Sequence, residues 1–345
     1  MKLAKLEAVR GFTAMFVFLG HLPAAKPFGP LNHVWLLTQE MVIVFFVLSG
    51  FVIYRSAHRT LSRGFMPYFW RRFVRIYSIL LPVLLLTAAL QPWRLHESNF
   101  GATLLGNLAM LQDTEWCKPG VIVPTVFRNL PLWSLHYEWW FYMAFFPLAT
   151  LLPAERQKHV VGLRGVGSAV VYLFAPHFVP RLFMYLTVWW LGVEAARLHL
   201  ASPAALTLRA MRGPLLYVAL TAAPSLVEAA LAFARGGPVV LGVHPFLEAR
   251  HLCAGVAIVL IAFAWRAAGW RGFRWVMAPF ALFAPISYSL YIAHFPLVAR
   301  ASHFAGLEPR WLQLGAYTAT LFAFCIAAEV WFFPWLRKRL FAASA

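Results

Sequence analysis

Charged residues are scarce in this sequence. Of its 345 residues only 12% are Asp, Glu, Lys or Arg, whereas 61% are hydrophobic, and the mean hydropathy is +0.69. A soluble globular domain has about 25% charged residues, so this composition excludes a soluble enzyme. The high apolar content also excludes a disordered chain. The composition is typical of a polytopic helical membrane protein, and we expect an all-α bundle.

Cysteine is scarce as well. The three cysteines, Cys117, Cys253 and Cys325, follow no paired spacing, and two of them lie in apolar runs. This pattern excludes a disulfide scaffold and offers no metal-binding motif. We therefore predict no metal site and no permanently bound cofactor.

Acidic residues are few, and the charge is one-sided. Twelve Asp and Glu stand against 30 Lys and Arg, which gives a formal net charge of +18. Such an excess has four possible sources: nucleic acid, anionic lipid, a phosphorylated ligand, or membrane topology alone. Nucleic-acid binding is disfavoured because the basic residues stand beside apolar runs and form no soluble patch.

Long apolar runs are abundant, and a helix needs about 20 apolar residues to cross the hydrocarbon core. Ten runs approach this length: 8–24, 34–54, 73–91, 131–152, 159–175, 180–198, 214–234, 251–267, 280–299 and 311–336. The run at 100–112 is too short, and we interpret it as an interfacial or re-entrant piece. We expect a single membrane domain over residues 1–345 with no fused soluble domain.

The distribution of Lys and Arg predicts the orientation. With the N-terminus in the cytoplasm and ten alternating spans, 21 of the 30 basic residues fall inside and nine fall outside. The positive-inside rule favours this arrangement, which places both termini in the cytoplasm. Most of the basic excess therefore reflects topology.

Ionisable residues inside spans are costly and usually functional. Arg10 and His21 share the first span, and eleven helical steps place them on one face with a rise of about 16 Å. Histidine is the natural general base near neutral pH. The alternative is a capping arginine and an unrelated interfacial histidine.

A second pair of arginines enters the third span. Arg72 and Arg75 are three residues apart and share a helical face. Two guanidiniums on one face suit bidentate phosphate binding. Taken by itself, however, the pair is better explained by topological anchoring or contact with lipid headgroups.

The fourth span opens with Ser134, Glu138 and Tyr142, spaced by four residues into one polar stripe. We place Glu138 at the depth of His21, where a carboxylate would orient a catalytic histidine. We interpret the tryptophans of this segment as an interfacial aromatic belt: Trp133, Trp139 and Trp140.

Two further ionisable residues fall in the outer half of the bundle, His294 in the ninth span and Glu40 in the second. His294 taken alone is better explained as a buried, satisfied histidine. Phosphate-binding groups thus collect at the cytoplasmic face and reactive groups in the outer half. A coenzyme A thioester has this shape, with a phosphorylated head and a reactive far end.

The chain resembles the membrane-bound acyltransferase family 3, which includes O-acetyltransferases of bacterial surface polysaccharides. Five segments carry the resemblance, in order: Leu6-Glu7-Ala8-Val9-Arg10-Gly11 through His21, Phe45-Phe46-Val47-Leu48-Ser49-Gly50-Phe51, Arg72-x-x-Arg75, Ser134-x-x-x-Glu138-x-x-x-Tyr142, and Ser287–Pro296. One departure is Met41-Val42-Ile43, where many members have Gly-Val and a polar residue. Glu40 lies close enough to substitute for that residue.

The resemblance implies roles for these residues. His21 matches the family's essential histidine and Arg10 its paired arginine, while Arg72 and Arg75 match the pair associated with the donor. It implies transfer of an acyl group, expected to be acetyl, from cytoplasmic acyl-CoA to a hydroxyl of a cell-surface or lipid-linked glycan. The expected location is the bacterial inner membrane, with membrane lipids as further partners. The alternative is a transporter or flippase for a glycan-related substrate, whose path the same polar groups would line.

Overall fold

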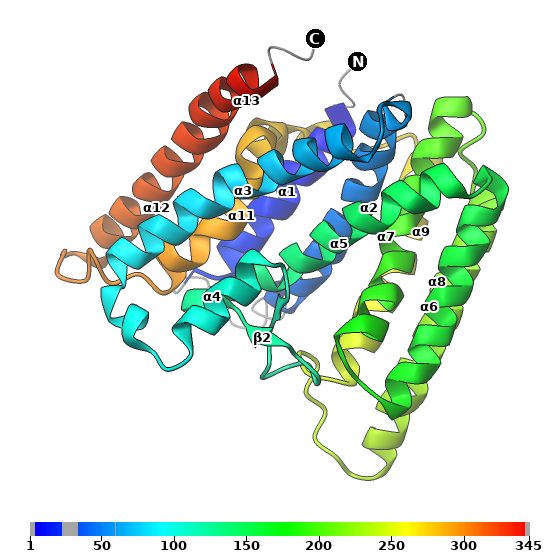
Figure 1. Ribbon diagram of the computed structural model, residues 1–345, viewed down its shortest axis with the longest axis horizontal. Coiled ribbons are helices and arrows are strands. Elements are labelled where there is room, and N and C mark those ends of the chain that lie inside the picture. The colour runs from blue at the N-terminus through cyan, green and yellow to red at the C-terminus, as the bar shows by residue number, and fades with distance from the viewer. Residues whose placement is uncertain (1–3, 23–33, 59, 342–345) are drawn as a thin grey trace.

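The structure is a computed structural model that describes residues 4–22, 34–58 and 60–341. Long helices run roughly side by side through the molecule, and the predicted all-α membrane fold is confirmed (Figure 1). The main helices are α1 (Ala4–Gly20), α2 (Thr38–Ala57), α3 (Phe65–Leu90), α5 (Leu135–Leu151), α6 (Ala154–Phe174), α7 (Phe178–Ala201), α8 (Leu208–Ala234), α9 (Phe246–Ala267), α11 (Ser287–His294), α12 (Arg310–Ile326) and α13 (Phe333–Phe341).

Short elements complete the chain. They are the helices α4 (Phe100–Leu108) and α10 (Phe273–Val276), the two-residue strands β1 (Gln112–Asp113) and β2 (Val123–Pro124), the 3₁₀ helices η3 (Leu61–Arg63), η4 (Pro92–His96), η5 (Val126–Arg128), η6 (Leu130–Ser134) and η7 (Ala278–Ile286), and the π-helical segments η8 (Phe295–Ala299) and η9 (Ala327–Phe332). β1 and β2 pair in parallel. The nine-residue α4 occupies the short apolar run 100–112, which is too short to cross a membrane.

All ten apolar runs expected to span the membrane contain helix. Within the described part of the chain, six helical stretches are long and apolar enough to cross: Val34–Ala57, Phe65–Leu90, Leu208–Ala234, Phe246–Ala267, Ala278–Ala299 and Arg310–Phe341. The other four runs hold α1, α5, α6 and α7. α1 and α5 have only 17 residues each, and α6 carries several charged side chains. The count of ten crossings therefore stays a prediction.

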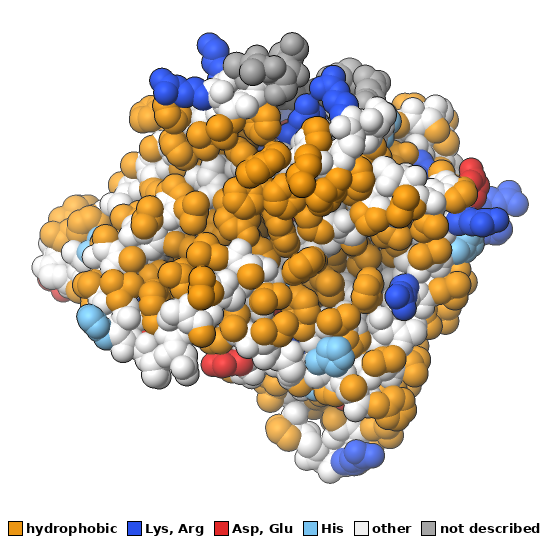
Figure 2. All heavy atoms as spheres, in the orientation of Figure 1, with side chains coloured by type: hydrophobic (Ala, Val, Ile, Leu, Met, Phe, Trp, Pro, Cys, Tyr) orange, Lys and Arg blue, Asp and Glu red, His pale blue; other side chains and the backbone are white. Residues whose placement is uncertain are grey.

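The two ends of the described chain lie at one end of the bundle (Figure 1). An even number of crossings requires this placement. Lys and Arg side chains gather at the same end, and hydrophobic side chains cover a broad band below it (Figure 2). We call this end the basic end. Three residues in the topological count, Lys2, Lys26 and Arg59, lie outside the described residues.

Small residues bring the helices into close contact. α2 packs along α7, where a Cβ on Gly192 would lie 1.9 Å from the Val47 carbonyl oxygen. A Cβ on Gly50 would likewise lie 2.1 Å from the Trp189 carbonyl oxygen. Small residues allow this approach of backbones in membrane bundles. Gly50 in the Phe45–Phe51 segment therefore serves helix packing.

Proline shapes the stretch that contains His294. The expected span 280–299 is a succession of the 3₁₀ helix η7, the short helix α11 and the π-helical η8. Pro285 and Pro296 have no backbone N–H and cannot continue a regular α-helical ladder. The altered winding determines the direction in which the side chain of His294, the last residue of α11, points.

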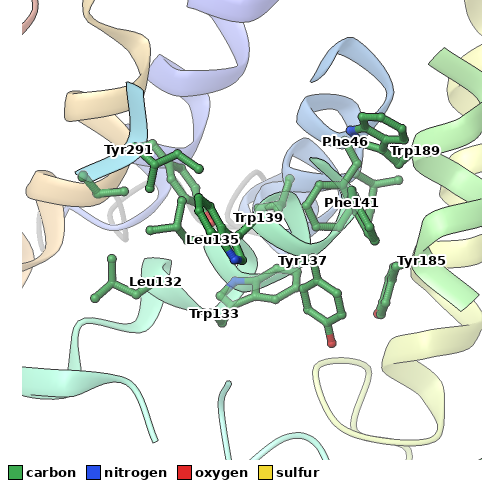
Figure 3. Close-up of a cluster of buried hydrophobic side chains, with 14 of the residues drawn as sticks. Phe46, Leu132, Trp133, Leu135, Tyr137, Trp139, Phe141, Tyr185, Trp189 and Tyr291 are labelled. Atoms are coloured by element: carbon green, nitrogen blue, oxygen red, sulfur yellow. The ribbon is translucent and has the colours of Figure 1, made fainter. Parts of the chain in front are cut away.

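The tryptophans of η6 and α5 do not form an interfacial belt. Trp133 and Trp139 are each only 8% exposed and pack among aromatic side chains of neighbouring helices (Figure 3). Trp140 is half-buried, and its Nε1 donates to the Met110 carbonyl at 2.8 Å. Their indole N–H groups and large apolar faces suit a core that offers hydrogen-bond acceptors. The interpretation as an interfacial belt was wrong, because the exposure of these tryptophans depends on which elements pack against them, and the sequence pattern does not show that.

Candidate active site

A cavity of about 930 Å³ opens at the basic end between α1, α3 and α13. Six basic side chains line it: Arg10, Arg71, Arg72, Arg75, Arg337 and Lys338. Glu329 is the one carboxylate among the lining residues. We call this cavity the basic pocket. It joins the three predicted donor-binding arginines in one site, and its excess positive charge suits a polyanionic ligand.

Two of the arginines, Arg10 and Arg72, are held by hydrogen bonds. The acceptors are a backbone carbonyl and a carboxylate for Arg10 and a hydroxyl for Arg72. Arg10 Nη2 donates to the Ala284 carbonyl at 2.6 Å and pairs with Glu7 at 3.0 Å. Arg72 Nη2 donates to Ser56 Oγ at 3.0 Å. The Nε atoms of both arginines are buried without a partner among the described residues. Each guanidinium therefore retains donor capacity for a ligand.

Arg75 is fixed by an ion pair. Its Nη1 and Nη2 lie 2.5 and 3.3 Å from the two carboxylate oxygens of Glu329, which is 2% exposed. Glu329 Oε1 also accepts the backbone N–H of Ser289 at 3.0 Å. This bidentate pair holds the Arg75 guanidinium at the pocket wall. It lowers the charge that Arg75 offers a ligand relative to Arg72.

Sequence reasoning did not identify Glu329, Arg71, Arg337 or Lys338 as site residues. Glu329 is an isolated carboxylate inside the last apolar run, so the principle that singled out Glu138 applies to it equally. The basic residues were counted as topology markers. Only their position on the cavity wall, with Arg71 on α3 and Arg337 and Lys338 on α13, indicates a second role.

At the opposite end of α1, His21 and His294 face one another. Their ring centroids are 5.1 Å apart. Nδ1 of His21 donates to the Val17 carbonyl at 2.8 Å, and Nδ1 of His294 donates to the Leu290 carbonyl at 3.0 Å. Because a carbonyl only accepts, both rings carry the proton on Nδ1 when neutral. Both Nε2 atoms are then bases, and His21 is half-buried and open to approach.

The polar stripe on α5 connects these two places. Tyr142 lies beside the basic pocket, with its ring centroid 5.9 Å from the Arg72 guanidinium. Glu138 accepts hydrogen bonds from Tyr142 and, at 2.8 Å, from Ser49. At the other end, Ser134 Oγ lies 2.9 Å from the hydroxyl of Tyr291, whose ring centroid is 6.3 Å from that of His294.

The expected contact between Glu138 and His21 is not present in the described part of the chain. The partners of Glu138 are Ser49 and Tyr142, and the partner of His21 Nδ1 is a backbone carbonyl. Helical periodicity assigns Glu138 to a face of α5 but does not say which helix lies opposite. The residue that accompanies His21 is His294.

Glu40 has a different partner from the one expected. It forms an ion pair with Arg250 of α9, whose Nε donates to Glu40 Oε1 at 2.9 Å. Arg250 also donates to the backbone carbonyls of Leu36 and Leu241. Glu40 therefore joins α2 to α9 and the loop before it, rather than replacing a polar residue at the site.

A buried ionic network lies at the end opposite the basic end, and sequence reasoning missed it. Asp113 pairs with Lys118 at 2.8 Å and with Arg181 at 3.1 Å, and all three side chains are at most 1% exposed. Tyr137 donates to the same carboxylate at 2.9 Å. Although burial opposes ionisation, Lys118 and Arg181 hold the pKa of Asp113 well below its usual range.

The network continues to α8 and α9. Arg181 donates to the Tyr172 hydroxyl at 3.0 Å, and Tyr172 donates to Glu248 at 2.9 Å. His244 then bridges Glu248 and Glu228, at 3.1 Å from each. These links fasten the segment 112–118 and the loop before α9 to the bundle. Across residues 4–22, 34–58 and 60–341, no three His, Cys, Asp or Glu side chains form a group suited to a metal ion.

Comparison with known proteins supports the sequence resemblance. Residues 3–330 match the family described as an acyltransferase domain. The acyltransferase MdmB of Streptomyces mycarofaciens is 30% identical over 184 residues, 50% of this chain and 46% of that protein. A putative membrane-bound transacylase, BcsY of Komagataeibacter xylinus, is 26% identical over 281 residues, 76% of this chain and 67% of that protein.

The chain thus spans about half the length of MdmB and two thirds of BcsY. No solved structure matches it. The family match covers both α1, with Arg10 and His21, and the arginine pair of α3. This protein belongs to the membrane-bound acyltransferase family 3 and is a multi-pass membrane protein.

Proposed function

We propose that this protein transfers an acyl group, acetyl in the simplest case, from acyl-CoA to a hydroxyl of a cell-surface or lipid-linked glycan. The observation that carries the proposal is the arrangement of α1. Its basic end contributes Arg10 to the basic pocket, and its other end presents His21 beside His294. Eleven helical steps lead from Arg10 to His21, about 16 Å along the helix.

The basic pocket is the proposed donor site. The head of coenzyme A carries several phosphates, and the pocket offers six cations against one carboxylate. Arg72 contributes most, because its hydrogen-bond acceptor is a neutral hydroxyl, whereas Arg75 is already paired with Glu329. Charge-assisted contacts to phosphate are the strong ones in such a site. By the positive-inside rule this end faces the cytoplasm of a bacterial inner membrane, where acyl-CoA is made.

The polar stripe of α5 is the proposed route between the sites. Tyr142, Glu138 and Ser134 offer polar groups at successive turns, and the first lies beside Arg72. Glu138 is half-buried although it lies within the bundle, so it faces accessible space. The amide-containing arm of coenzyme A needs polar partners of this kind inside a membrane.

The chemistry then requires one base. In the proposed step, His21 Nε2 takes the proton of the acceptor hydroxyl while the oxygen attacks the thioester carbonyl carbon. The C–O bond forms, the C–S bond breaks, and the coenzyme A thiolate recovers the proton from the imidazolium. The Nδ1–H bond to Val17 holds the ring in the required tautomer. A transient acyl-histidine is the second possible course, with transfer to the acceptor in a following step.

The experiment uses membranes that contain the full chain and acetyl-CoA labelled in the acetyl group. Label that appears in surface or lipid-linked glycan, and that mild base releases as acetate, supports the proposal. In a deletion strain, ester analysis of the surface glycans should show that the same acetyl ester is missing. If the deletion strain retains every ester and the membranes transfer no label, the glycan acceptor is wrong.

The transport alternative predicts a different result. A transporter or flippase moves its substrate across vesicles without consuming acyl-CoA. The family assignment favours acyl transfer, and no observation in the described residues favours transport. Dependence of glycan modification on acetyl-CoA, with release of free coenzyme A thiol, distinguishes the two.

A further inference from the structure

A second cavity, of about 940 Å³, lies on the outer side of α3 against η9 and α13. Apolar side chains make up most of its wall: Met66, Pro67, Trp70, Phe73, Val74, Leu81, Pro82, Leu85, Phe332, Leu336, Leu340 and Phe341. We call it the α3–α13 groove. Several of these side chains are widely exposed, including Leu85 at 72% and Met66 at 62%. In a bundle that spans a membrane, this surface faces the acyl chains of lipid.

Positive charge marks one end of the groove. Arg63 and Arg71 line it near the start of α3, and no acidic residue is among its lining residues. Neither guanidinium has a hydrogen-bond or ion-pair partner within the described part of the chain. Arg71, Val74 and Phe341 also line the basic pocket, so the groove begins beside it. Two uncompensated guanidiniums at the head of an apolar groove call for an anionic amphiphile.

The length of the groove agrees with such a ligand. From Arg71 to Leu85 the helix advances fourteen residues, about 21 Å. The hydrocarbon core is about 30 Å thick, so one leaflet accounts for about half of it. The groove therefore runs from the basic end to beyond the middle of the membrane. A lipid whose phosphate lies at the arginines has room for its acyl chain along the whole wall.

We propose that the α3–α13 groove binds an anionic phospholipid, with its phosphate at Arg63 and Arg71 and an acyl chain along α3 and η9. Basic pockets between membrane helices on the cytoplasmic side bind anionic headgroups in this way. A second copy of the chain is a poorer occupant. In a twofold dimer through this face, the groove of one copy faces the same groove of the other copy. This arrangement brings four arginines together without a carboxylate among the lining residues.

The test reconstitutes the full chain in phosphatidylcholine nanodiscs that contain a minor fraction of phosphatidylglycerol with a photoreactive acyl chain. Labelled peptides are mapped by mass spectrometry. We expect labels in 81–85 and 332–336, several-fold more than from photoreactive phosphatidylcholine. Arg63→Gln and Arg71→Gln should each lower this labelling by about fivefold. Arg209→Gln, which removes an exposed charge at the start of α8, should not change it.

Three results would overturn the proposal. Equal labelling by the two lipids would show that the arginines select no headgroup. Labels spread evenly over other helices would show that the groove holds no particular lipid. A disulfide formed between two copies through Leu85→Cys, with loss of lipid labelling, would show that a second chain occupies the face. None of these measurements depends on acyl transfer, so they stand apart from the proposed function.

Discussion

His21 and His294 lie ring to ring, 5.1 Å between centroids, at the end of α1 away from the basic pocket. Each donates its Nδ1–H to the carbonyl four residues before it in the chain. Both rings therefore present Nε2 as a lone pair, and that of His294 is buried without a partner among the described residues. An acceptor hydroxyl brought to this place meets two bases, of which His21 is the accessible one.

We predict that His21→Ala abolishes acyl transfer while the protein still reaches the membrane. General-base catalysis contributes about 10²- to 10⁴-fold, so activity should fall by about that factor. The measurement is transfer of labelled acetyl to glycan by membranes with equal protein content. His96→Ala, which removes an exposed histidine of η4, is the control and should retain full activity. Normal transfer by the His21 variant would exclude His21 as the base.

Arg72→Ala should weaken donor binding first. A hydrogen bond to a charged group contributes about 1.5–3 kcal/mol, which corresponds to an increase of about tenfold or more in KM for acyl-CoA. The KM for the acceptor should stay unchanged, because Arg72 lies in the basic pocket away from the histidines. Steady-state kinetics with each substrate varied in turn makes the distinction. An effect confined to the acceptor would contradict the donor role.

Two substitutions of Glu138 distinguish the contribution of its hydrogen bonds to stability from that of its charge. Glu138→Gln keeps an oxygen that accepts from Ser49 and Tyr142, whereas Glu138→Ala leaves two hydroxyls without their acceptor. An unsatisfied buried donor costs about 1–3 kcal/mol, so the alanine variant should have the lower unfolding temperature in detergent. Thermal denaturation of both variants tests this. Equal destabilisation would mean that the carboxylate charge, rather than the hydrogen bonds, matters there.

Loss of Asp113 should destabilise the protein strongly. Asp113→Ala leaves Lys118 and Arg181 buried without their carboxylate, and breaking a buried pair in this way costs about 3–5 kcal/mol. Expression yield and thermal denaturation in detergent report the loss. Glu97→Ala breaks an exposed pair with Arg94 and should change the unfolding temperature little. A tolerated Asp113 variant would show that the network contributes no stability.

The bridge that His244 forms in the loop before α9 predicts that the stability of the protein depends on pH. Burial lowers the pKa of His244, but the bonds to Glu228 and Glu248 outweigh burial and raise it from 6.5 to about 9. A raised pKa stabilises the fold fully below about pH 6.5, and this contribution is lost as the pH rises through about 9. The unfolding temperature of the wild type should therefore fall over that interval. His244→Gln should fall less, and identical curves would refute the bridge.

Features local to one helix followed from the sequence. Arg10 and His21 share a face because His21 directly follows the regular helix α1, and eleven helical steps complete slightly more than three turns. Arg72 and Arg75 enter the same pocket as Arg10 because alternating spans return them to the basic end. These predictions needed only periodicity, run length and the positions of Lys and Arg.

Contacts between segments distant in the chain could not be predicted from the sequence. The Asp113 network lies outside the apolar runs, in the segment before α5, where no periodicity marks it. The partner of Glu138 was assigned wrongly because periodicity does not identify the opposing helix. The tryptophans of η6 and α5 were wrongly assigned to an interface, because the packing of α2, α3, α9 and the loop before α5 buries them and no helical pattern reports that packing.

The sequence by itself determined the membrane class, the all-α fold, the basic end and the spacing of Arg10 and His21. Each depends on composition or on the regular geometry of a single helix. Only the tertiary structure decided that Glu329 holds Arg75 across 254 residues and that His294 stands beside His21. The proline-broken winding of 278–299 and the close packing of α1 against it place His294 beside His21, and no local pattern encodes either.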